Sequence, residues 1–252
     1  MKKIYRSIDI LLFLVIFIFM FIYIKDKIDV TNYLKIDNKY EYNLPLLSSL
    51  YKYNNSNVKV FKEIPSIYIF NTHYEEEYSD TNVIEISKIL SEKLKENGFN
   101  SIFEDINYKE YIKINNLIGI NNYVVLRKII EDKINKNDLK LIIDLHRDSI
   151  NKEDSTITIN NKKYAKVLFV VDNYYKDYLK KYDLAYKLNG YLDKYKGLSR
   201  GVYVKNGKGF NQDLSNNMIL LELGGYKNTK EELLNTIDII IDMIKEYING
   251  KE

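Results

Sequence analysis

Leu139-Lys140-Leu141-Ile142-Ile143-Asp144-Leu145-His146 is a short, mostly apolar run that ends on a histidine. Its length and composition predict a buried strand that carries His146 at its carboxyl end. Two other apolar runs have ionisable residues in the corresponding place: His73 follows a strand predicted at 67–70, and Glu222 lies near the end of a third strand. The residues able to do chemistry therefore follow the predicted strands.

The segments between the strands show helical periodicity, so strands and helices alternate along the chain. This order predicts an α/β fold, a three-layer sandwich in which helices cover both faces of a mixed, mostly parallel sheet. We expect a β-hairpin around Asn160-Asn161 from 156–159 and 167–171, and a capping box at Thr229 and Glu232 that opens the last helix. Helices are predicted at 83–97, 123–134, 174–195 and 229–248, and the other strands at 102–103 and 202–204.

The composition limits the chemistry open to this chain. It has 252 residues, 46% of them apolar and 29% charged, enough for one ordinary domain or two small ones and unlike a disordered chain. Cysteine is absent, which excludes disulfides, thiolate metal sites and cysteine nucleophiles. His73 and His146 are the only histidines.

The net charge of +3 comes from the first 27 residues, which hold five basic and two acidic side chains. The other 225 residues are neutral, with 33 basic and 33 acidic side chains. Nucleic-acid binding requires a basic face or stripe, so we expect no nucleic-acid partner.

The N-terminal segment also contains an uninterrupted apolar run at 10–24. At about 1.5 Å per residue it spans roughly 22 Å, and it approaches the roughly 30 Å hydrocarbon core of a bilayer if Asp9 and Lys25 snorkel. We therefore predict a cytoplasmic stub and transmembrane anchor at 1–27. A cleaved signal peptide is the alternative, but Lys25-Asp26-Lys27 stands where small residues would be needed.

The flanking charges predict the orientation of the anchor. Lys2, Lys3 and Arg6 precede the span, whereas the charges behind it cancel. The positive-inside rule then places the N-terminus in the cytoplasm and the body on the outer side of the membrane. Residues 28–63 show no sustained periodicity and are predicted to be a stalk, which leaves 64–252 as the folded domain.

Three predicted strands bring ionisable residues to one edge of the sheet, where α/β proteins carry their sites. Two imidazoles and one carboxylate with an open fourth position form a typical catalytic zinc site. Such a site also needs a carboxylate that takes up the proton of the attacking water. Glu222 is a candidate for the site, since a carboxylate in an apolar strand must be neutralised or linked to a metal. A salt bridge to Arg200 or Lys205 is its structural alternative.

Five motifs follow one another along the body. They are Asn71-Thr72-His73-Tyr74-Glu75-Glu76-Glu77-Tyr78, Asp144-Leu145-His146-Arg147-Asp148, Ser199-Arg200-Gly201-Val202, Phe210-Asn211-Gln212-Asp213-Leu214, and Leu221-Glu222-Leu223-Gly224-Gly225 with Asn228-Thr229-x-x-Glu232. Their residues and order resemble the stage II sporulation protein P family, over about residues 65–248 and with a similar N-terminal anchor. That family shows His-Thr-His-x-x-Glu-Ser-Tyr, Asp-x-His-Arg-Asp, Ser-Arg-Gly, Tyr-Asn-Gln-Asp-Leu and Glu-x-Gly-Gly…Asn-Thr-x-x-Glu.

The resemblance implies the α/β fold of zinc N-acetylmuramoyl-L-alanine amidases, which zinc carboxypeptidases share, and one zinc ion. It implies zinc ligands at His73, Glu76 and His146, with Glu222 as general base and acid. Glu76 lies three residues after His73, as in the family motif; its neighbours Glu75 and Glu77 are the alternatives.

The resemblance also bears on residues around the zinc site. Arg147, Arg200 and Asn211 would hold peptide carboxylates or sugar hydroxyls, with salt bridges and turn contacts as their structural alternatives. Asp148 would orient a ligand imidazole. Asn71 stands where the family often has a first histidine, which puts some substrate binding in doubt, and Phe210 replaces a tyrosine.

The implied activity of the 64–252 domain is hydrolysis of peptidoglycan at the amide between N-acetylmuramic acid and L-alanine, and of peptide cross-links. The implied setting is forespore engulfment, at the septum between forespore and mother cell and beside a lytic transglycosylase and other engulfment proteins. A zinc carboxypeptidase-type peptidase has the same order of ligands and base, but the Asn-Arg pair that would hold a terminal carboxylate is absent. A metal-free wall-binding scaffold is the third possibility, against which the complete ligand set argues.

Overall fold

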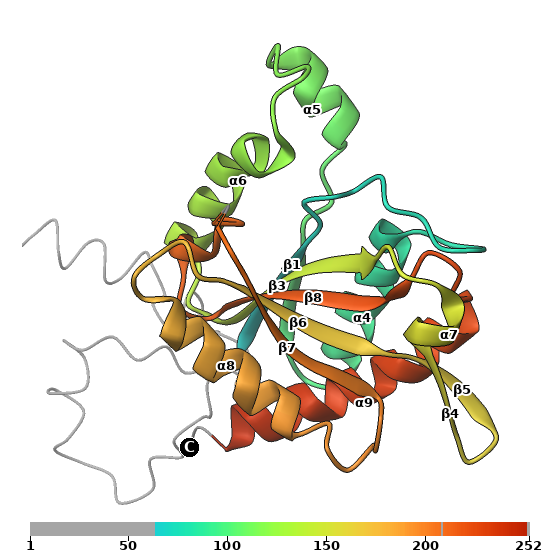
Figure 1. Cartoon of the computed structure of the whole chain (residues 1–252). Coiled ribbons are helices and arrows are strands. Elements are labelled where there is room, and N and C mark those ends of the chain that lie inside the picture. Colours follow the sequence, from blue (N-terminus) through green and yellow to red (C-terminus); the bar gives the residue numbers. More distant parts are fainter. Residues whose placement is uncertain (1–63, 208, 251–252) are drawn as a thin grey trace, which may run out of the picture. The chain divides into compact units, whose positions relative to one another are not determined.

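One six-stranded sheet organises the residues that the structure, a computed structural model, describes: 64–207 and 209–250. Neighbouring strands are parallel at every step across the sheet except one, where the fourth and fifth strands are antiparallel. The prediction of a mixed, mostly parallel sheet is confirmed. In order across the sheet, the strands are β2 (Asn100–Phe103), β1 (Ser66–Phe70), β3 (Leu139–Asp148), β8 (Met218–Gly225), β6 (Val167–Asp172) and β7 (Ser199–Lys205) (Figure 1).

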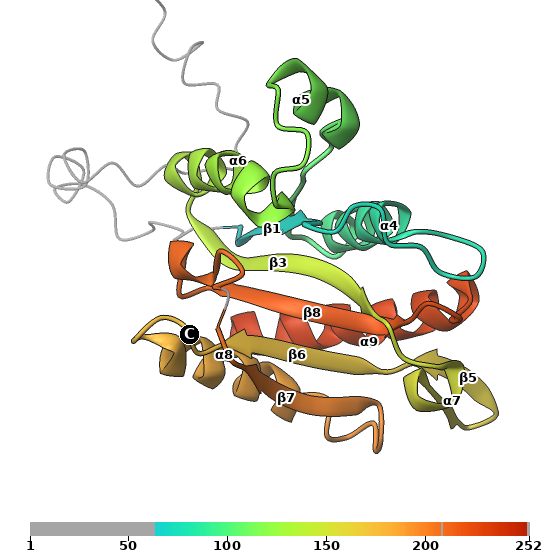
Figure 2. The same cartoon turned by 45° about the horizontal axis from the view of Figure 1, so that its top comes forward.

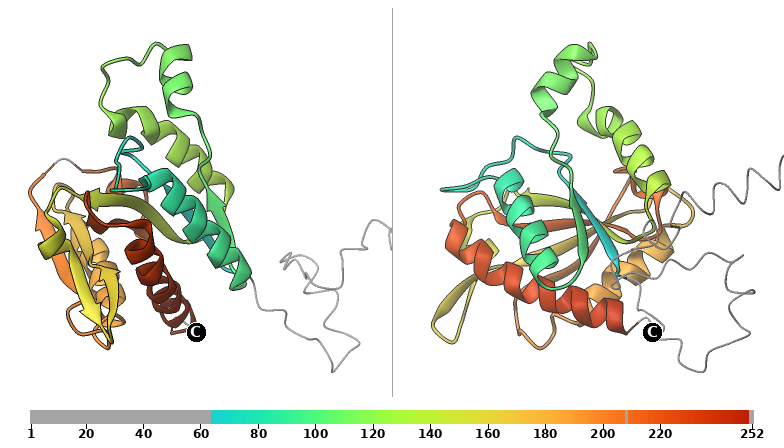
Figure 3. Two further views of the ribbon diagram at one scale, coloured as in Figure 1. Left: turned by 90° about the vertical axis from the view of Figure 1, so that its right-hand side faces the viewer. Right: turned by 180° about the vertical axis from the view of Figure 1, so that it is seen from behind.

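Helices cover both faces of this sheet. The apolar side chains of α4 (Val83–Glu96), α8 (Tyr178–Gly190) and α9 (Lys230–Asn249) pack on one face, and Figure 3 shows α4 and α9 side by side there. On the other face, side chains of α5 (Tyr108–Ile114) and α6 (Asn122–Lys136) pack against β1 and β3. Figure 2 shows that α5 extends away from the sheet.

The alternation of side chains along each strand decides which residues reach which face. In β3, Ile143 and Leu145 belong to the core shared with α4, α8 and α9. Asp144 and His146 therefore point to the opposite face, on the side of α6. The same alternation applies to β8. Leu221 and Leu223, on either side of Glu222, belong to the core shared with α4, α8 and α9, so the Glu222 side chain points to the opposite face of the sheet, as that of His146 does.

The predicted β-hairpin is wrong in its second strand. Its turn residues Asn160 and Asn161 both have positive φ, 50° and 63°, as a two-residue hairpin turn requires, so the returning strand begins at once. β4 (Thr156–Ile159) therefore pairs with β5 (Lys162–Ala165). Residues 167–171 are mostly buried and instead form β6 inside the main sheet, antiparallel to β8.

Several helices also differ from the predictions, among them the unpredicted short helix α7 (Lys152–Ser155). The helix expected over 174–195 is shorter, because a turn precedes α8 in which the Tyr174 N–H donates to the Asp172 carboxylate. No element was predicted where α5 lies. This helix has only seven residues and begins at an Asn107 cap, too short a stretch for periodicity to reveal it.

The predicted anchor at 1–27 and stalk at 28–63 lie outside the described residues. Within the part of the chain that the structure describes, no helix has both the length and the apolar composition needed to cross a membrane. The boundary between 63 and 64 stays a prediction.

Candidate metal centre and active site

Three adjacent strands deliver the predicted site residues to the carboxyl edge of the sheet. His73 follows β1, His146 lies near the end of β3, and Glu222 lies in β8. His146 and Glu222 are register partners on parallel strands. Residues that are far apart in the sequence thus meet on one face, where open α/β sheets place their ligands.

Two imidazoles and one carboxylate form a compact cluster at this edge. Glu76 Oε1 lies 3.2 Å from His73 Nδ1, and Glu76 Oε2 lies 3.6 Å from His146 Nδ1. The candidate ligand atoms of the three residues lie within 4.8 Å of one another. Two nitrogen donors and one oxygen donor suit a divalent metal such as zinc and leave coordination positions for water or substrate, so the residues present fit a catalytic metal.

The turn after β1 holds Glu76 beside the histidines. The Glu76 N–H donates to the His73 carbonyl at 3.0 Å, and Glu76 Oε2 accepts a hydrogen bond from the Arg147 N–H at 2.9 Å. Burial would raise the pKa of Glu76, but the hydrogen bonds with His146, His73 and Arg147 outweigh it and lower the pKa to about 2. The carboxylate is therefore ionised at neutral pH and available to a cation.

The neighbouring glutamates point elsewhere. Glu75 is exposed and forms a 3.7 Å ion pair with Lys109, and the Glu77 side chain is also exposed. Among the described residues, Glu76 is the carboxylate of this triplet that the turn brings to the two histidines.

His146 is buried, 2% exposed, between two carboxylates. Its Nδ1 faces Glu76, and its Nε2 lies 3.0 Å from Asp144 Oδ1. Burial lowers the pKa of His146, but the Asp144 and Glu76 charges outweigh this and raise the pKa well above its usual value. A cation bound at Nδ1 would replace the proton on that nitrogen.

Glu222 lies beside the cluster with a free oxygen. Its buried Oε2 has no hydrogen-bond partner among the described residues. Burial raises the pKa of Glu222 to about 7; His146 opposes this increase, and the carboxylates of Glu76, Asp148 and Asp144 add to it. A carboxyl group with this pKa can take up and release a proton near neutral pH, which is what a general base and acid must do.

These groups open into a cleft with a volume of about 490 Å³. Two aromatic rings in the cleft lining pack against each other: those of Tyr123, at the start of α6, and of Phe210, whose centroids are 5.1 Å apart. The rings of Tyr123 and His73 also form a T-shaped contact, with centroids 5.5 Å apart. The cleft lining thus combines aromatic rings with His73, His146 and Glu222, and Glu76 contacts both histidines without lining the cleft itself.

Asp148 and Arg200 line the same cleft and bind each other. Arg200 Nη1 donates to Asp148 Oδ2 at 2.6 Å. Among the described residues no ion pair joins Glu222 to Arg200 or to Lys205, so the structural alternative for Glu222 is not formed. We expected Asp148 to orient a ligand imidazole; the carboxylate beside the His146 ring is instead Asp144.

Arg147 and Asn211 do not line the cleft; they form hydrogen bonds with segments that carry site residues. Arg147 Nε donates to the Glu77 carbonyl at 3.0 Å. Asn211 Nδ2 donates to the Tyr123 carbonyl at 2.7 Å, which ties its loop to the start of α6. Both residues make the turn contacts that were the alternative to direct substrate binding.

Sequence reasoning missed Tyr123 and Asp144. Asp144 precedes His146 by two positions on one strand, so period-2 alternation could have placed both on one face. Tyr123 had no comparable signal, since one tyrosine among 24 at the start of a helix does not stand out.

Asn71, the departure from the family pattern, is fully buried rather than in the cleft. Its Nδ2 donates to Ser87 Oγ at 2.9 Å and to the Leu145 carbonyl at 2.6 Å. These bonds tie the end of β1 to α4 and β3. Asn71 therefore makes structural contacts in this chain and does not line the cleft.

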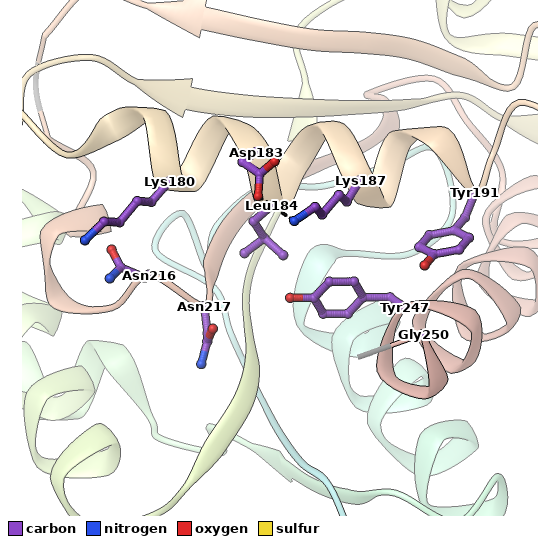
Figure 4. Close-up of a pocket in the computed structure, with 9 residues that line it drawn as sticks. All are labelled: Lys180, Asp183, Leu184, Lys187, Tyr191, Asn216, Asn217, Tyr247 and Gly250. Carbon is purple, nitrogen blue, oxygen red and sulfur yellow. Dashed lines mark ion pairs between the residues drawn. The ribbon is translucent and has the colours of Figure 1, made fainter. Parts of the chain in front are cut away.

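A second hollow, of about 380 Å³, lies between α8 and α9 near the amino end of β8 (Figure 4). Tyr191 and Tyr247 line it, and Lys187 there pairs with Asp183 at 2.7 Å. Both histidines of the chain lie elsewhere, so this hollow lacks the donors of the first site.

The fold of this domain is similar to the fold of solved amidase structures. The domain resembles the CwlD amidase from Clostridioides difficile, solved in complex with the GerS lipoprotein, with a TM-score of 0.53 and 16% identity over 74% of this chain and 99% of that one. An N-acetylmuramoyl-L-alanine amidase from Clostridium difficile 630 matches with a TM-score of 0.49 and 14% identity over 76% of this chain and 100% of that one. The likeness to the first structure shows an amidase-like α/β fold, as expected.

The sequence comparisons are more specific. The profile of stage II sporulation protein P (SpoIIP) matches residues 25–245. Stage II sporulation protein P of Bacillus subtilis (strain 168) is 31% identical in an alignment of length 201 that covers 71% of this chain and 50% of that protein. The chain belongs to the stage II sporulation protein P family, and it spans about half the length of this curated relative.

Proposed function

We propose that this chain is a zinc-dependent peptidoglycan hydrolase that cleaves the amide between the lactyl group of N-acetylmuramic acid and L-alanine. The observation that carries the proposal is that His73, His146 and Glu222 line one cleft, with Glu76 beside both histidines and with Glu222 Oε2 lacking a hydrogen-bond partner among the described residues. Membership of a sporulation family and an amidase-like fold support it.

The proposed reaction divides the work between the cluster and Glu222. His73, Glu76 and His146 would hold one zinc ion, which supplies Lewis-acid polarisation of the scissile carbonyl and a more acidic water. Glu222 takes a proton from the attacking water, whose oxygen bonds to the carbonyl carbon. As the C–N bond breaks, Glu222 donates that proton to the leaving amine of L-alanine. Its free Oε2 and its pKa near 7 suit both steps.

Of the remaining predicted residues, Arg200 would bind the substrate directly, and Arg147 and Asn211 would hold other residues of the site. Arg200 is exposed to the cleft, so its guanidinium would bind a carboxylate or carbonyl of the stem peptide by exchanging its bond to Asp148. Arg147 would act through the backbone bond that it gives to Glu76, and Asn211 through Tyr123. Tyr123 itself would pack against the substrate.

The test is product analysis. Full-length protein in detergent is incubated with purified peptidoglycan, and the products are identified by mass spectrometry. The proposal expects peptides with a free L-alanine amine, released by protein with zinc and not after chelation. Fragments cut at cross-links would indicate endopeptidase activity. Release of single C-terminal residues would indicate the carboxypeptidase-type alternative. A folded, zinc-free protein that binds wall without cutting it would favour the scaffold and contradict the proposal.

We also propose that the chain is anchored by 1–27 with its N-terminus in the cytoplasm and its domain on the wall side, at the septum of sporulating cells. The support is the apolar run, its flanking charges and the family. Engulfment partners, among them a lytic transglycosylase, follow from the family resemblance. Protease added to intact protoplasts should remove the domain, whereas protection of the domain would contradict this orientation.

A further inference from the structure

The buried carboxylate of Asp144 lies where the two histidine-bearing segments meet. Asp144 is 1% exposed. Its Oδ1 lies 3.0 Å from His146 Nε2 and accepts a hydrogen bond from the Thr72 N–H at 2.9 Å. Its Oδ2 accepts a hydrogen bond from Thr72 Oγ1 at 2.7 Å. Thr72 directly precedes His73, so one side chain contacts both segments that carry histidine ligands.

No lysine or arginine forms an ion pair with Asp144 among the described residues. Burying a carboxylate is costly unless polar partners satisfy it, and here Thr72 donates two hydrogen bonds while the His146 imidazole lies 3.0 Å away without an aligned hydrogen bond. The strand register produces the arrangement: Phe70 of β1 is the register partner of Asp144, so Thr72 lies just beyond the paired end of β1. The carboxylate therefore sits where it can hold both segments.

The contact with Nε2 selects the nitrogen that His146 offers to a metal. A carboxylate beside Nε2 favours a proton on that nitrogen, which leaves the lone pair on Nδ1. Nδ1 is the atom that faces Glu76, at 3.6 Å. Metal-bound histidines commonly donate their other N–H to such a carboxylate, which orients the ring and strengthens the ligand.

We propose that Asp144 is the positioning residue of the metal centre, orienting His146 so that Nδ1 binds the ion and holding the Thr72 backbone so that His73 reaches the same ion. Asp148, the acidic residue that motif reasoning favoured, is bonded to Arg200 instead. The inference rests on the metal binding proposed above and assigns the histidine geometry to a residue outside the ligand set.

The test measures zinc affinity and the coordinating nitrogen in the full-length protein in detergent. Zinc affinity is obtained by competition with a chromophoric chelator, and ¹⁵N shifts of histidine-labelled, zinc-loaded protein report which nitrogen binds. The chain has only two histidines, so two sets of ring signals arise, and correlating each ring with its backbone signals assigns them without removing a ligand. The wild type should bind zinc through His146 Nδ1 and carry a proton on Nε2.

Three variants separate the two contacts of Asp144. Asp144→Ala should weaken zinc binding about 10- to 100-fold and lose the single Nδ1-bound form. Asp144→Asn keeps an acceptor and should keep the Nδ1-bound form with a smaller loss of affinity. Thr72→Val removes one bond to Asp144 and should lower affinity while leaving the His146 nitrogen pattern unchanged. Asp138→Asn, an exposed carboxylate just before β3, is the control and should bind zinc as the wild type does.

The outcomes distinguish the two proposals. A wild type that binds no zinc contradicts the proposed function and this inference with it. A wild type that binds zinc through His146 Nε2 contradicts this inference alone, as does unchanged affinity in folded Asp144→Ala. If Asp144→Ala does not fold, Asp144→Asn and Thr72→Val decide, and wild-type affinity in both overturns the role of Asp144.

Discussion

His146 of β3 and Glu222 of β8 are register partners on neighbouring parallel strands, and both side chains face the same cleft. Direct partners on adjacent strands share a face, so the sheet itself sets the distance between a metal ligand and the proposed base. A functional side chain on a strand is held in a more precise position than one on a loop. His73 and Glu76, on the turn after β1, complete the site against this rigid pair.

Glu222→Gln should retain zinc and lose at least about 100-fold in turnover, because the amide cannot accept a proton from water. Turnover is measured on peptidoglycan fragments and zinc by elemental mass spectrometry. The matched control is Glu231→Gln on the exposed surface of α9, which should remain fully active. Turnover of the Glu222 variant within a few-fold of wild type would mean that another group is the base.

Glu76→Gln should lose zinc at concentrations that saturate the wild type, because the neutral amide is a poor ligand and the charge of the site changes. Glu77→Gln, one residue along and exposed, should keep zinc and activity. His146→Ala should also abolish zinc uptake and digestion of the wall. Equal zinc content in the two glutamine variants would show that Glu76 is not a ligand.

The raised pKa of Glu222 predicts a pH dependence of stability in the chelated, metal-free protein. The folded-state pKa of about 7 exceeds the ordinary value of 4.5. The folded chain therefore holds a proton that the unfolded chain releases, so this contribution is full below pH 4.5 and is lost as the pH rises through 7. Wild type should lose up to about 3 kcal/mol relative to Glu222→Gln over this window.

Thermal or denaturant unfolding of both proteins between pH 4 and pH 8, with circular dichroism as readout, gives this difference. Subtracting the curves removes the groups that titrate in both proteins. Parallel curves across the window would show that Glu222 has an ordinary pKa. Added zinc should reduce the difference, since a nearby cation lowers the pKa of the carboxyl group.

Arg200→Ala should raise KM by about tenfold or more and change kcat much less, because a charged hydrogen bond to the substrate is lost while the cluster and Glu222 remain. Asp148→Asn should instead lower KM if Arg200 must leave Asp148 to bind substrate. Both constants are measured on one soluble muropeptide. A fall in kcat alone would place Arg200 in the chemical step rather than in binding.

The predicted capping box of the last helix is confirmed and gives a stability prediction. Glu232 accepts hydrogen bonds from the Thr229 N–H and Asn228 Nδ2, both at 3.0 Å, and pairs with Lys152 at 3.1 Å. Glu232→Ala leaves these donors unpaired in a buried place and should destabilise the fold by about 1–3 kcal/mol. Glu231→Ala, exposed in the same turn, should stay within about 0.5 kcal/mol of wild type.

By itself, the sequence determined the alternation of strands and helices, the α/β class and the residues available for a metal site. These follow from local patterns: apolar runs at 67–70 and 139–145, helical spacing between them, and two histidines placed after these apolar runs. The family motifs added the ligand spacing between His73 and Glu76. Periodicity and composition need only neighbouring residues, so they can be read without a fold.

Only the tertiary structure decided which carboxylates lie beside the histidines. Glu76, and neither of its neighbours, turns toward the histidines, and Asp144 rather than Asp148 meets the His146 ring. The strand after Asn160-Asn161 is β5, since positive φ at both turn residues returns the chain at once. These outcomes depend on strand register and side-chain direction between segments about 70 residues apart, which local sequence patterns do not encode.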